Sequence, residues 1–490
     1  MDVAVFSAAV RSPSVLDDTP FAAEVLSRLP LADSVWRLLR YAMADSWLDG
    51  LWARNRGPCF EKQLKFRTLA HLITDALIEH EGSGYQAFTR AQEQGTLPVS
   101  ITSSYDKLGN LPLPLSEALL AEGTQRLNAV LPETLAVDPL PECWAGFEVF
   151  GADGKAIKHV HRLLKPLRGL QAGILGARAS VGLDLRTGLA VAMVGHLDGE
   201  AGEAALTEGL LPKLAELAGE KLWLVVLDRL YGNLSFPREV LKAGGHFLIR
   251  YCSNTTFVAD ESRPAQELRD ADGRRIVQEW GWLGKVAKAD RVYVRRITKH
   301  LADGKELGVI TDLWDEATYP AEAMLTTYHS RWSLETVFQQ ITDVFALKHL
   351  IGTQPKAVLF QLSFCLLLYN ALQVVRTHLA SHQECEAKAI SNEKLFGDVE
   401  RQMVSVSELV EVKTLLALLG AVPTASEVRT YLRERLRGAW SDRWWKAPSS
   451  GRGGHQKVKK RVLGNHTSTY RVLQQAHEQK TGPPTAVRRP

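Results

Sequence analysis

The stretch Leu222–Leu227 constrains the fold of this 490-residue chain more than any other, because every residue in it is apolar. A strand without polar alternation must be covered on both faces, as in the centre of a sheet that carries helices on either side. The strand leads directly into Asp228. We therefore expect a mixed α/β domain around it, with a carboxylate where the strand leaves the core.

Patterns on either side of this strand predict the rest of the sheet. Between Gly146 and Tyr251 they indicate three strands, a helix, a strand, a helix and a strand, which predicts a mixed sheet with helices against it. Asp153-Gly154 is a hairpin signal and places Asp153 at the end of the first strand. Ligands gather at the carboxyl ends of strands in open α/β sheets. Asp153 and Asp228 are therefore candidate site residues, although aspartate is also a common turn residue.

A third acid lies on the segment from Tyr328 to Thr342, which we expect to form one helix with two faces. At about 100° per residue, Tyr328, Arg331, Glu335 and Thr342 share one stripe. The opposite, apolar face is formed by Leu334, Val337, Phe338, Ile341 and Phe345. A carboxylate beside a cation is a candidate metal ligand, and the cation a candidate phosphate contact. Taken alone, the i,i+4 pair of Arg331 and Glu335 is more typical of a surface salt bridge.

The three acids together resemble those of the ribonuclease-H-like nucleotidyltransferases. Asp228-Arg-Leu-Tyr231-Gly-Asn after an apolar strand looks like the second-aspartate motif of the DDE transposases of bacterial insertion sequences. Tyr328-x2-Arg331-x3-Glu335 resembles the Tyr-x2-Arg-x3-Glu-x6-Lys signature of the insertion-sequence-4 family, which also has a long β insertion before the glutamate. The resemblance spans about residues 100–380 of this sequence.

The sequence departs from that signature at Thr342, where the family has lysine. Lys348 lies six residues further on and too far round the helix to replace it. A threonine hydroxyl can still bond a phosphate, but without the positive charge.

The resemblance implies catalytic and metal-binding roles for Asp153, Asp228 and Glu335, which would hold two Mg²⁺ ions, with Mn²⁺ able to substitute. Carboxylates suit Mg²⁺, and two such ions activate the attacking oxygen and stabilise the leaving one. It also implies a set of DNA-binding residues, namely Tyr328, Arg331, Thr342, Trp332 and Tyr231.

The implied function is that of an insertion-sequence transposase that cleaves the transposon ends and transfers them into target DNA by a cut-and-paste route. The implied partners are double-stranded terminal inverted repeats, target DNA and a second copy of the chain in the DNA complex. Two alternatives stay open. One is a catalytically decayed or domesticated transposase that binds DNA, which Thr342 admits; the other is a different ribonuclease-H-like nuclease.

Composition excludes several other classes. The five cysteines are far apart and form no CxxC pair, so neither a zinc cluster nor a disulfide framework is expected, and a reducing cytoplasm is the simplest compartment. The resemblance implies that this is a bacterial cytoplasm, with the nucleoid when DNA is bound. The longest apolar stretch, Ala357–Val375, is interrupted by polar residues, so we expect no membrane partner. The net charge of +4 is small, but positive residues dominate from Lys446 onward, which is typical of a solubilising or polyanion-binding tail.

The expected architecture is a ribonuclease-H-like mixed α/β core interrupted by an all-β insertion, with helical N-terminal and C-terminal regions. The predicted regions are a helical DNA-end-binding region at 1–135, the first part of the catalytic core at 136–251, an inserted β subdomain at 252–318, the second part of the core with the Glu335 helix at 319–380, a C-terminal helical region at 381–446 and a basic flexible tail at 447–490.

Overall fold

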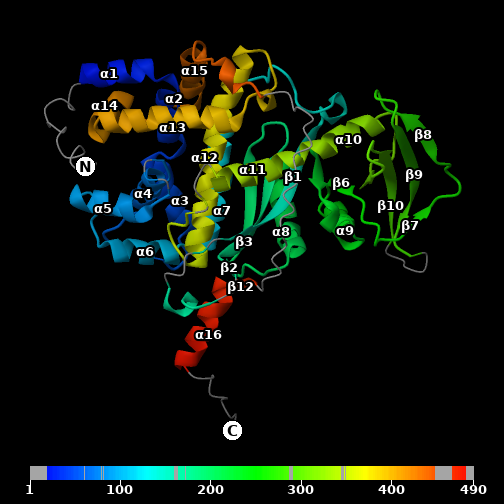
Figure 1. Cartoon of the computed structure of the whole chain (residues 1–490), viewed down its shortest axis with the longest axis horizontal. Helices are drawn as coiled ribbons and strands as arrows, with labels where there is room; N and C mark the ends of the chain where they lie inside the picture. Colours follow the sequence, from blue (N-terminus) through cyan, green and yellow to red (C-terminus); the bar gives the residue numbers. More distant parts are fainter. Residues whose placement is uncertain are drawn as a thin grey trace, which may run out of the picture.

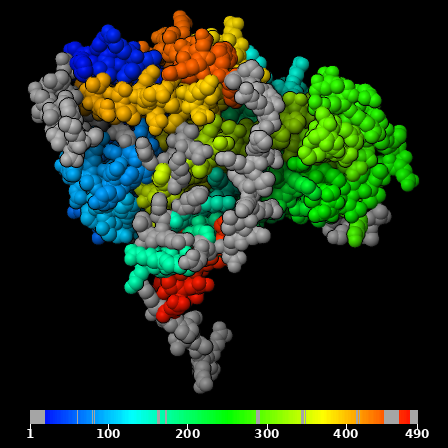
Figure 2. Space-filling view, viewed as in Figure 1, coloured from blue at the N-terminus to red at the C-terminus, as the bar shows by residue number. Residues whose placement is uncertain are grey.

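The computed structural model shows a body in which helices surround one end of a sheet, and a lobe formed by the other end (Figure 1). A space-filling view shows this lobe standing to one side of the body (Figure 2). The residues that the structure describes are 19–59, 61–78, 80, 82–158, 160, 164–170, 173–285, 291–343, 347, 349–446 and 466–481.

Within these residues, ten strands form one mixed sheet in the order β4-β3-β1-β5-β6-β11-β10-β9-β7, with β8 beside β9, while β12 and β2 form a small second sheet. The strands are β1 (Phe147–Ile157), β2 (Gly173–Leu175), β3 (Ala177–Asp184), β4 (Ala190–His196), β5 (Leu222–Leu227), β6 (His246–Arg250), β7 (Phe257–Ala259), β8 (Gln266–Arg269), β9 (Arg275–Leu283), β10 (Val292–His300), β11 (Glu306–Thr311) and β12 (His466–Ser468).

The helices are α1 (Thr19–Arg28), α2 (Pro30–Ala42), α3 (Asp45–Asn55), α4 (Phe66–Ile78), α5 (Gly84–Glu93), α6 (Ile101–Asn110), α7 (Leu113–Asn128), α8 (Glu203–Ala218), α9 (Ser235–Lys242), α10 (Ala321–Ser330), α11 (Trp332–Asp343), α12 (Pro355–His382), α13 (Asn392–Leu409), α14 (Val412–Leu419), α15 (Ala425–Leu436) and α16 (Thr469–Thr481). The 3-10 helices are η2 (Glu142–Trp144), η3 (Lys165–Leu167), η4 (Arg229–Tyr231), η5 (Ala387–Ala389) and η6 (Asp442–Trp444).

Strand β5 lies at the centre of the body and is buried on both faces, as its apolar run predicts. Leu224 and Val226 belong to the hydrophobic core shared with α7, α11 and α12, whereas Trp223, Val225 and Leu227 belong to the core shared with α8 and α9. Because side chains alternate along a strand, both faces need apolar residues. The expected mixed sheet with helices against it is thereby confirmed.

The sheet combines antiparallel and parallel pairing in the body. Strands β1, β3 and β4 are antiparallel neighbours, while β5 and then β6 run parallel to β1. The segment expected as an inserted β subdomain does contain strands, but they extend this same sheet through the antiparallel pair of β6 and β11. The helical character expected at both ends of the chain is confirmed, and the boundaries of the six regions stay predictions.

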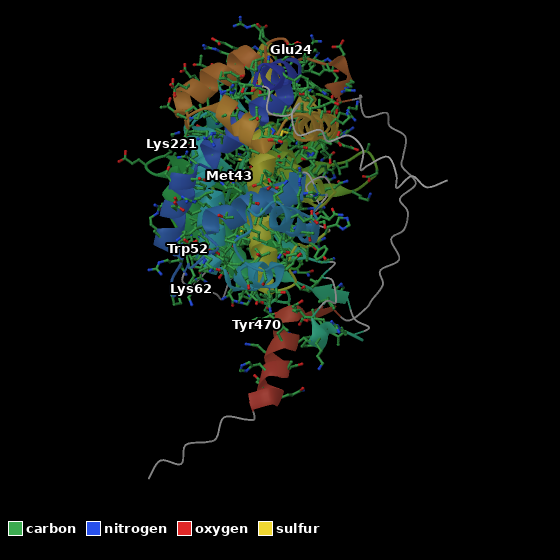
Figure 3. The ribbon with its side chains drawn as sticks, turned by 90° about the vertical axis from the view of Figure 1, so that its left-hand side faces the viewer. Glu24, Met43, Trp52, Lys62, Lys221 and Tyr470 are labelled. Carbon is green, nitrogen blue, oxygen red and sulfur yellow. The ribbon has the colours of Figure 1, made fainter. Side chains whose placement is uncertain are left out.

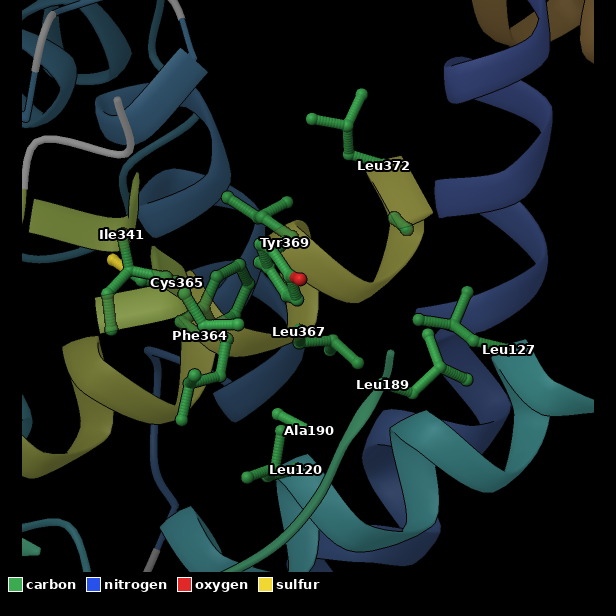
Figure 4. Close-up of a cluster of buried hydrophobic side chains, with 14 of the residues drawn as sticks. Leu120, Leu127, Leu189, Ala190, Ile341, Phe364, Cys365, Leu367, Tyr369 and Leu372 are labelled. Carbon is green, nitrogen blue, oxygen red and sulfur yellow. The ribbon is translucent and has the colours of Figure 1, made fainter. Parts of the chain in front are cut away.

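Helix α12 is the axis of the helical part of the body. By length and composition it could cross a membrane, but its apolar window is completely buried inside the protein. Figure 4 shows its residues Phe364, Leu367 and Tyr369 beside Leu120 of α7 and Ile341 of α11. The helix is predominantly apolar, as expected for a helix that other elements cover on every side.

A buried polar contact fixes α12 against the edge of the sheet. The Asn370 side chain accepts a hydrogen bond from the Ala190 backbone N–H at 2.8 Å and donates to the Ala190 carbonyl and to Thr124 Oγ1, both at 2.8 Å. Asn370 has no solvent exposure. Its amide therefore links α12, β4 and α7 in one arrangement, because a buried polar group is costly without partners.

Part of the predicted flexible tail is folded. Residues 466–468 form β12, which pairs in parallel with β2, and α16 follows, with Tyr470 near its start (Figure 3). Arg471 forms ion pairs with Asp198 at 2.8 Å and with Glu200. The expectation of flexibility is therefore wrong for 466–481, because the strand edge of β2 and two acids give this segment partners; residues 447–465 and 482–490 lie outside the described part of the chain.

We expect Asn370→Ala to lower the free energy of unfolding by about 2–3 kcal/mol, because the Ala190 backbone groups and the Thr124 hydroxyl would lose a buried partner. Urea unfolding followed by circular dichroism measures the change. Asn128→Ala, at the exposed end of α7, is the matched control and should change stability little. Equal effects of the two substitutions would show that the Asn370 contacts contribute nothing.

Candidate active site

The register of the sheet places Asp153 and Asp228 just beyond the paired part of adjacent strands. In the parallel pair of β1 and β5, Gly151 lies opposite Val226, and the pairing ends there. Asp153 follows Gly151 by two residues within β1, and Asp228 follows Val226 by two residues, just beyond the end of β5. Both residues follow the alternation that points Gly151 and Val226 toward α11, so they project from the same face of the sheet.

Asp153 does not end the first strand, and the expected hairpin at Asp153-Gly154 is absent. Strand β1 continues to Ile157, with Asp153 opposite Val181 of β3. Pairing along β3 therefore overrides the local turn signal. Gly154 instead allows the Glu203 side chain to pack closely against β1, because a Cβ at this position would lie 2.3 Å from Cδ of Glu203.

Asp228 also forms the local turn that its residue type favours. Its Oδ1 accepts a hydrogen bond from the backbone N–H of Leu230 and caps η4. This contact fixes the carboxylate just beyond the end of β5. The turn reading and the site reading of Asp228 are thus both consistent with the structure.

The segment from Tyr328 to Thr342 is two helices rather than the expected single one, because the α-helical pattern is interrupted at Arg331. Arg331 keeps right-handed helical dihedrals, and its carbonyl accepts from the Leu334 N–H at 2.9 Å. The two helices therefore follow one another in line (Figure 1). The predicted apolar face is confirmed by the burial of Leu334, Val337, Phe338 and Ile341, while Phe345 lies outside the described residues.

Arg331 connects the third acid to the first. Its guanidinium donates from Nη2 to Glu335 Oε1 at 3.0 Å and lies with Nη1 3.9 Å from Asp153 Oδ2. The Arg331 side chain is 4% exposed, whereas that of Glu335 is 60% exposed. Arg331 Nε and Nη1 have no hydrogen-bond partner among the described residues. Asp153 and Glu335 thus lie on either side of one buried cation.

Groups near Arg331 offset the effect of burial on its pKa. Burial alone lowers the pKa of Arg331, but Tyr328, Glu335 and Asp153 outweigh that effect and the net pKa is raised. Tyr328 is itself buried, which raises the pKa of its phenol, and the negative charge of Asp228 raises it further. The charge of Asp228, at the end of β5, thus acts on Tyr328 as well as on Asp153.

The described residues contain no group of three or more His, Cys, Asp or Glu side chains arranged to hold a metal ion. Arg331 lies 3.9 Å from Asp153 and 3.0 Å from Glu335. The donor set nevertheless suits a hard divalent cation, because all three acids supply carboxylate oxygens.

Glu203, at the first position of α8, is a fourth carboxylate that the sequence did not single out. Burial raises the pKa of Asp153 to about 6, and the negative charge of Glu203 is the next largest cause. Glu203 Oε1 accepts from the Tyr231 hydroxyl at 3.1 Å, and that hydroxyl also bonds Thr207 at 2.9 Å. An acid at a helix N-terminus is so common that its sequence carries no distinguishing signal.

Four of the five expected DNA contacts fall into two groups. Tyr231, Tyr328 and Arg331 are buried, so in this conformation they support the acids rather than offer a surface to DNA. Trp332 is 52% exposed and remains accessible.

Thr342 is held by neighbouring groups on two elements. Its hydroxyl donates to the Phe338 carbonyl at 2.6 Å and accepts from Lys155 Nζ at 3.2 Å. Lys348 lies outside the described residues.

Comparison with known proteins places this site inside one domain. Residues 148–371 match the family described as "Transposase DDE domain". That range contains all three acids and ends within α12. The class is a polynucleotidyl transferase class, and it works with divalent metal ions.

Two individual proteins are also similar. The curated protein "Putative transposase y4zB" of Sinorhizobium fredii (strain NBRC 101917 / NGR234) is 23% identical over 152 residues, which are 30% of this chain and 41% of that protein. This chain thus matches less than half the length of that relative. A cryo-EM structure of a piggyBac transposase synaptic complex with hairpin DNA has 11% identity and a TM-score of 0.37, and the match covers 88% of this chain and 89% of that one. A TM-score of this size supports no inference about this chain.

Asp153 should make stability depend on pH when no metal ion is bound. Its pKa is about 6 in the folded chain against an ordinary value of 3.8, so between these values the folded state binds more protons than the unfolded state. Stability therefore falls as the pH rises from about 4 to about 6, and the full penalty, roughly 2–3 kcal/mol, is present above that range.

Asp153→Asn should remove this penalty. In EDTA the variant should be more stable than the wild type well above pH 6 and should lose that advantage near pH 4. Urea unfolding at both pH values measures the difference. Asp272→Asn, whose parent side chain is 70% exposed, is the control. An advantage of Asp153→Asn that is the same at both pH values would contradict the assigned cause.

Proposed function

We propose that this chain, whose residues 148–371 are a transposase DDE domain, is an insertion-sequence transposase of the insertion-sequence-4 type. It cleaves the ends of the element and transfers them into target DNA by a cut-and-paste route that depends on Mg²⁺. The observation that carries the proposal is that Arg331 pairs with Glu335 and approaches Asp153, while the charge of Asp228 at the end of the neighbouring strand also acts on Asp153.

The topology supports a ribonuclease-H-like core. Three antiparallel strands, β4, β3 and β1, are followed across the sheet by two strands parallel to β1, namely β5 and β6. The first two acids lie where parallel pairing between β1 and β5 ends, which is where ligands bind in open α/β sheets. The third comes from the helix that packs on that face.

The carboxylates of Asp153, Asp228 and Glu335 would hold the divalent ions. When bound, such ions supply Lewis-acid stabilisation of the attacking and leaving oxygens. The chain supplies the rest. Arg331 keeps Asp153 and Glu335 close together despite their like charges, and its Nε and Nη1 are donors that a phosphate oxygen could accept from. In cleavage, a water oxygen forms the new bond to phosphorus, and the 3′-oxygen of the strand leaves and takes up a proton. In transfer, that 3′-oxygen loses its proton and forms a bond to a phosphorus of the target strand, whose own 3′-oxygen leaves and takes up a proton.

The proposed setting follows from the proposed reaction. Two transposon ends must be held at once, so the chain acts as a homodimer on terminal inverted repeats and target DNA. Its compartment is the bacterial cytoplasm, with the nucleoid when DNA is bound. Trp332, exposed beside the cluster, is placed to contact DNA.

A catalytically decayed transposase that still binds DNA is the second candidate. Two observations favour it, namely Thr342 at the signature lysine position and the absence of a preformed three-acid metal group among the described residues. Cleavage activity separates the two candidates, because only the first requires the acids to hold metal.

Glu335→Gln should abolish Mg²⁺-dependent nicking while DNA binding survives. We expect a loss of at least about 100-fold, since residues that merely support a metal ligand already contribute about 10–100-fold. The substrate is a supercoiled plasmid that carries the coding region with its flanking DNA, and nicking is measured on agarose gels. Glu322→Gln, an exposed acid on α10, is the matched control and should cleave normally.

Each other outcome has a definite meaning. Nicking by Glu335→Gln at the wild-type rate would refute the role of Glu335 as a ligand. DNA binding without nicking by the wild-type chain would establish the decayed transposase.

A further inference from the structure

Strand β1 extends beyond its parallel neighbour, and its free edge opens into a pocket. Strand β5 ends at Leu227, so from Gly154 to Ile157 β1 pairs only with β3. A pocket of about 340 Å³ lies along this edge. Its polar lining includes Lys155, Lys158, Arg178, Glu203 and Thr342.

Lys155 is held in this pocket by α11. Its ammonium group donates to Thr342 Oγ1 at 3.2 Å and to the Phe338 carbonyl at 3.3 Å, and it lies 5.4 Å from the centroid of the Phe338 ring. Because Thr342 donates its own proton to the Phe338 carbonyl, its oxygen is free to accept from Lys155. The Lys155 ammonium group is therefore held between its own strand, β1, and helix α11.

The position of Lys155 relative to the acids is set by the strand. Lys155 follows Asp153 by two residues on β1, so both project from the same face about 7 Å apart. That separation is comparable to the distance between successive phosphates along a nucleic-acid strand. A strand whose scissile phosphodiester lies at Asp153 and Asp228 would place its neighbouring phosphate at Lys155.

The pocket favours an anion. Lys155, Lys158 and Arg178 contribute three positive charges against the single carboxylate of Glu203, whose Oε2 lies 4.0 Å from Arg178 Nη2, so the two lysines remain as the excess of positive charge. Arg178 is fixed by a hydrogen bond from Nη1 to the Ala201 carbonyl at 2.6 Å, and its Nε is buried without a partner among the described residues. Charge-assisted donors of this kind are the usual contacts to backbone phosphates.

We propose that the Lys155 pocket binds the backbone phosphate next to the reacting phosphodiester. The inference rests on the proposed function and deepens it, because it assigns to the site a phosphate subsite formed by β1, β3 and α11. The subsite positions the strand through its backbone and reads no base. Its cations also offset the repulsion between the acids and the incoming polyanion.

The test measures DNA affinity without metal. Binding of a short fluorescein-labelled duplex is followed by anisotropy in EDTA over a series of NaCl concentrations. Lys155→Gln should lower the slope of log affinity against log salt by about 0.9, the value for one lost phosphate contact. Lys155→Arg keeps the charge and should restore the slope.

Two further variants keep the result interpretable if Lys155→Gln melts at a lower temperature than the wild type. Lys158→Gln replaces an exposed side chain of the same pocket and should also lower the slope. Lys221→Gln replaces a side chain that is 66% exposed at the other end of β5, where it projects into solvent (Figure 3), and should leave the slope unchanged. An unchanged slope in both Lys155→Gln and Lys158→Gln would overturn the proposal.

The source of the phosphate and the link to cleavage are tested separately. At equal ionic strength, sodium phosphate should compete with DNA no better than NaCl; stronger competition would identify free phosphate as the ligand and overturn the proposal. Loss of nicking in Glu335→Gln together with an unchanged slope in the pocket variants would refute the subsite alone. A wild-type chain that binds no DNA would refute both the subsite and the transposase function.

Discussion

The structure of the site depends on one buried cation. Arg331 lies at the junction of α10 and α11, pairs with Glu335 on its own helix and approaches Asp153 on β1. A buried guanidinium is unfavourable without negative partners, and clustered carboxylates repel one another. The two costs offset each other only when helix and strand adopt this relative position. The junction thereby fixes α11 over the sheet edge where Asp153 and Asp228 lie.

Much of the fold could be predicted because it follows from the spacing of apolar residues within short segments of the sequence. The unbroken apolar run of β5 and the apolar stripe of α11 each depend only on neighbouring residues, and both are buried as expected. The failures involve distant partners. The Asp153-Gly154 turn signal was overridden by pairing with β3, and the strands after β6 joined the main sheet through β11. The residue pattern of a single strand does not predict which other strand it will pair with.

The same division holds within the site. Asp153, Asp228 and Glu335 could be proposed because their residue types and chain order resemble a known set, and the first two each follow the last paired residues of β1 and β5 by two positions. Glu203 and Lys155 could not be found in this way. Glu203 reads as an ordinary acid at a helix start. The contact of Lys155 with Thr342 joins residues 187 positions apart in the chain.

Asp153 shows why this tertiary detail matters to the chemistry. Helix α8, on one face of the sheet, brings Glu203 toward it and raises its pKa, whereas Arg331, from the other face, lowers that pKa. Burial and Glu203 outweigh Arg331, so the carboxyl retains its proton up to about pH 6. A divalent cation would act in the same direction as Arg331 and with greater charge. The proton affinity of this residue is thus set by its burial, by the Gly154 N–H and by charged groups on both sides of one strand, and of these only the Gly154 contact is local in the sequence.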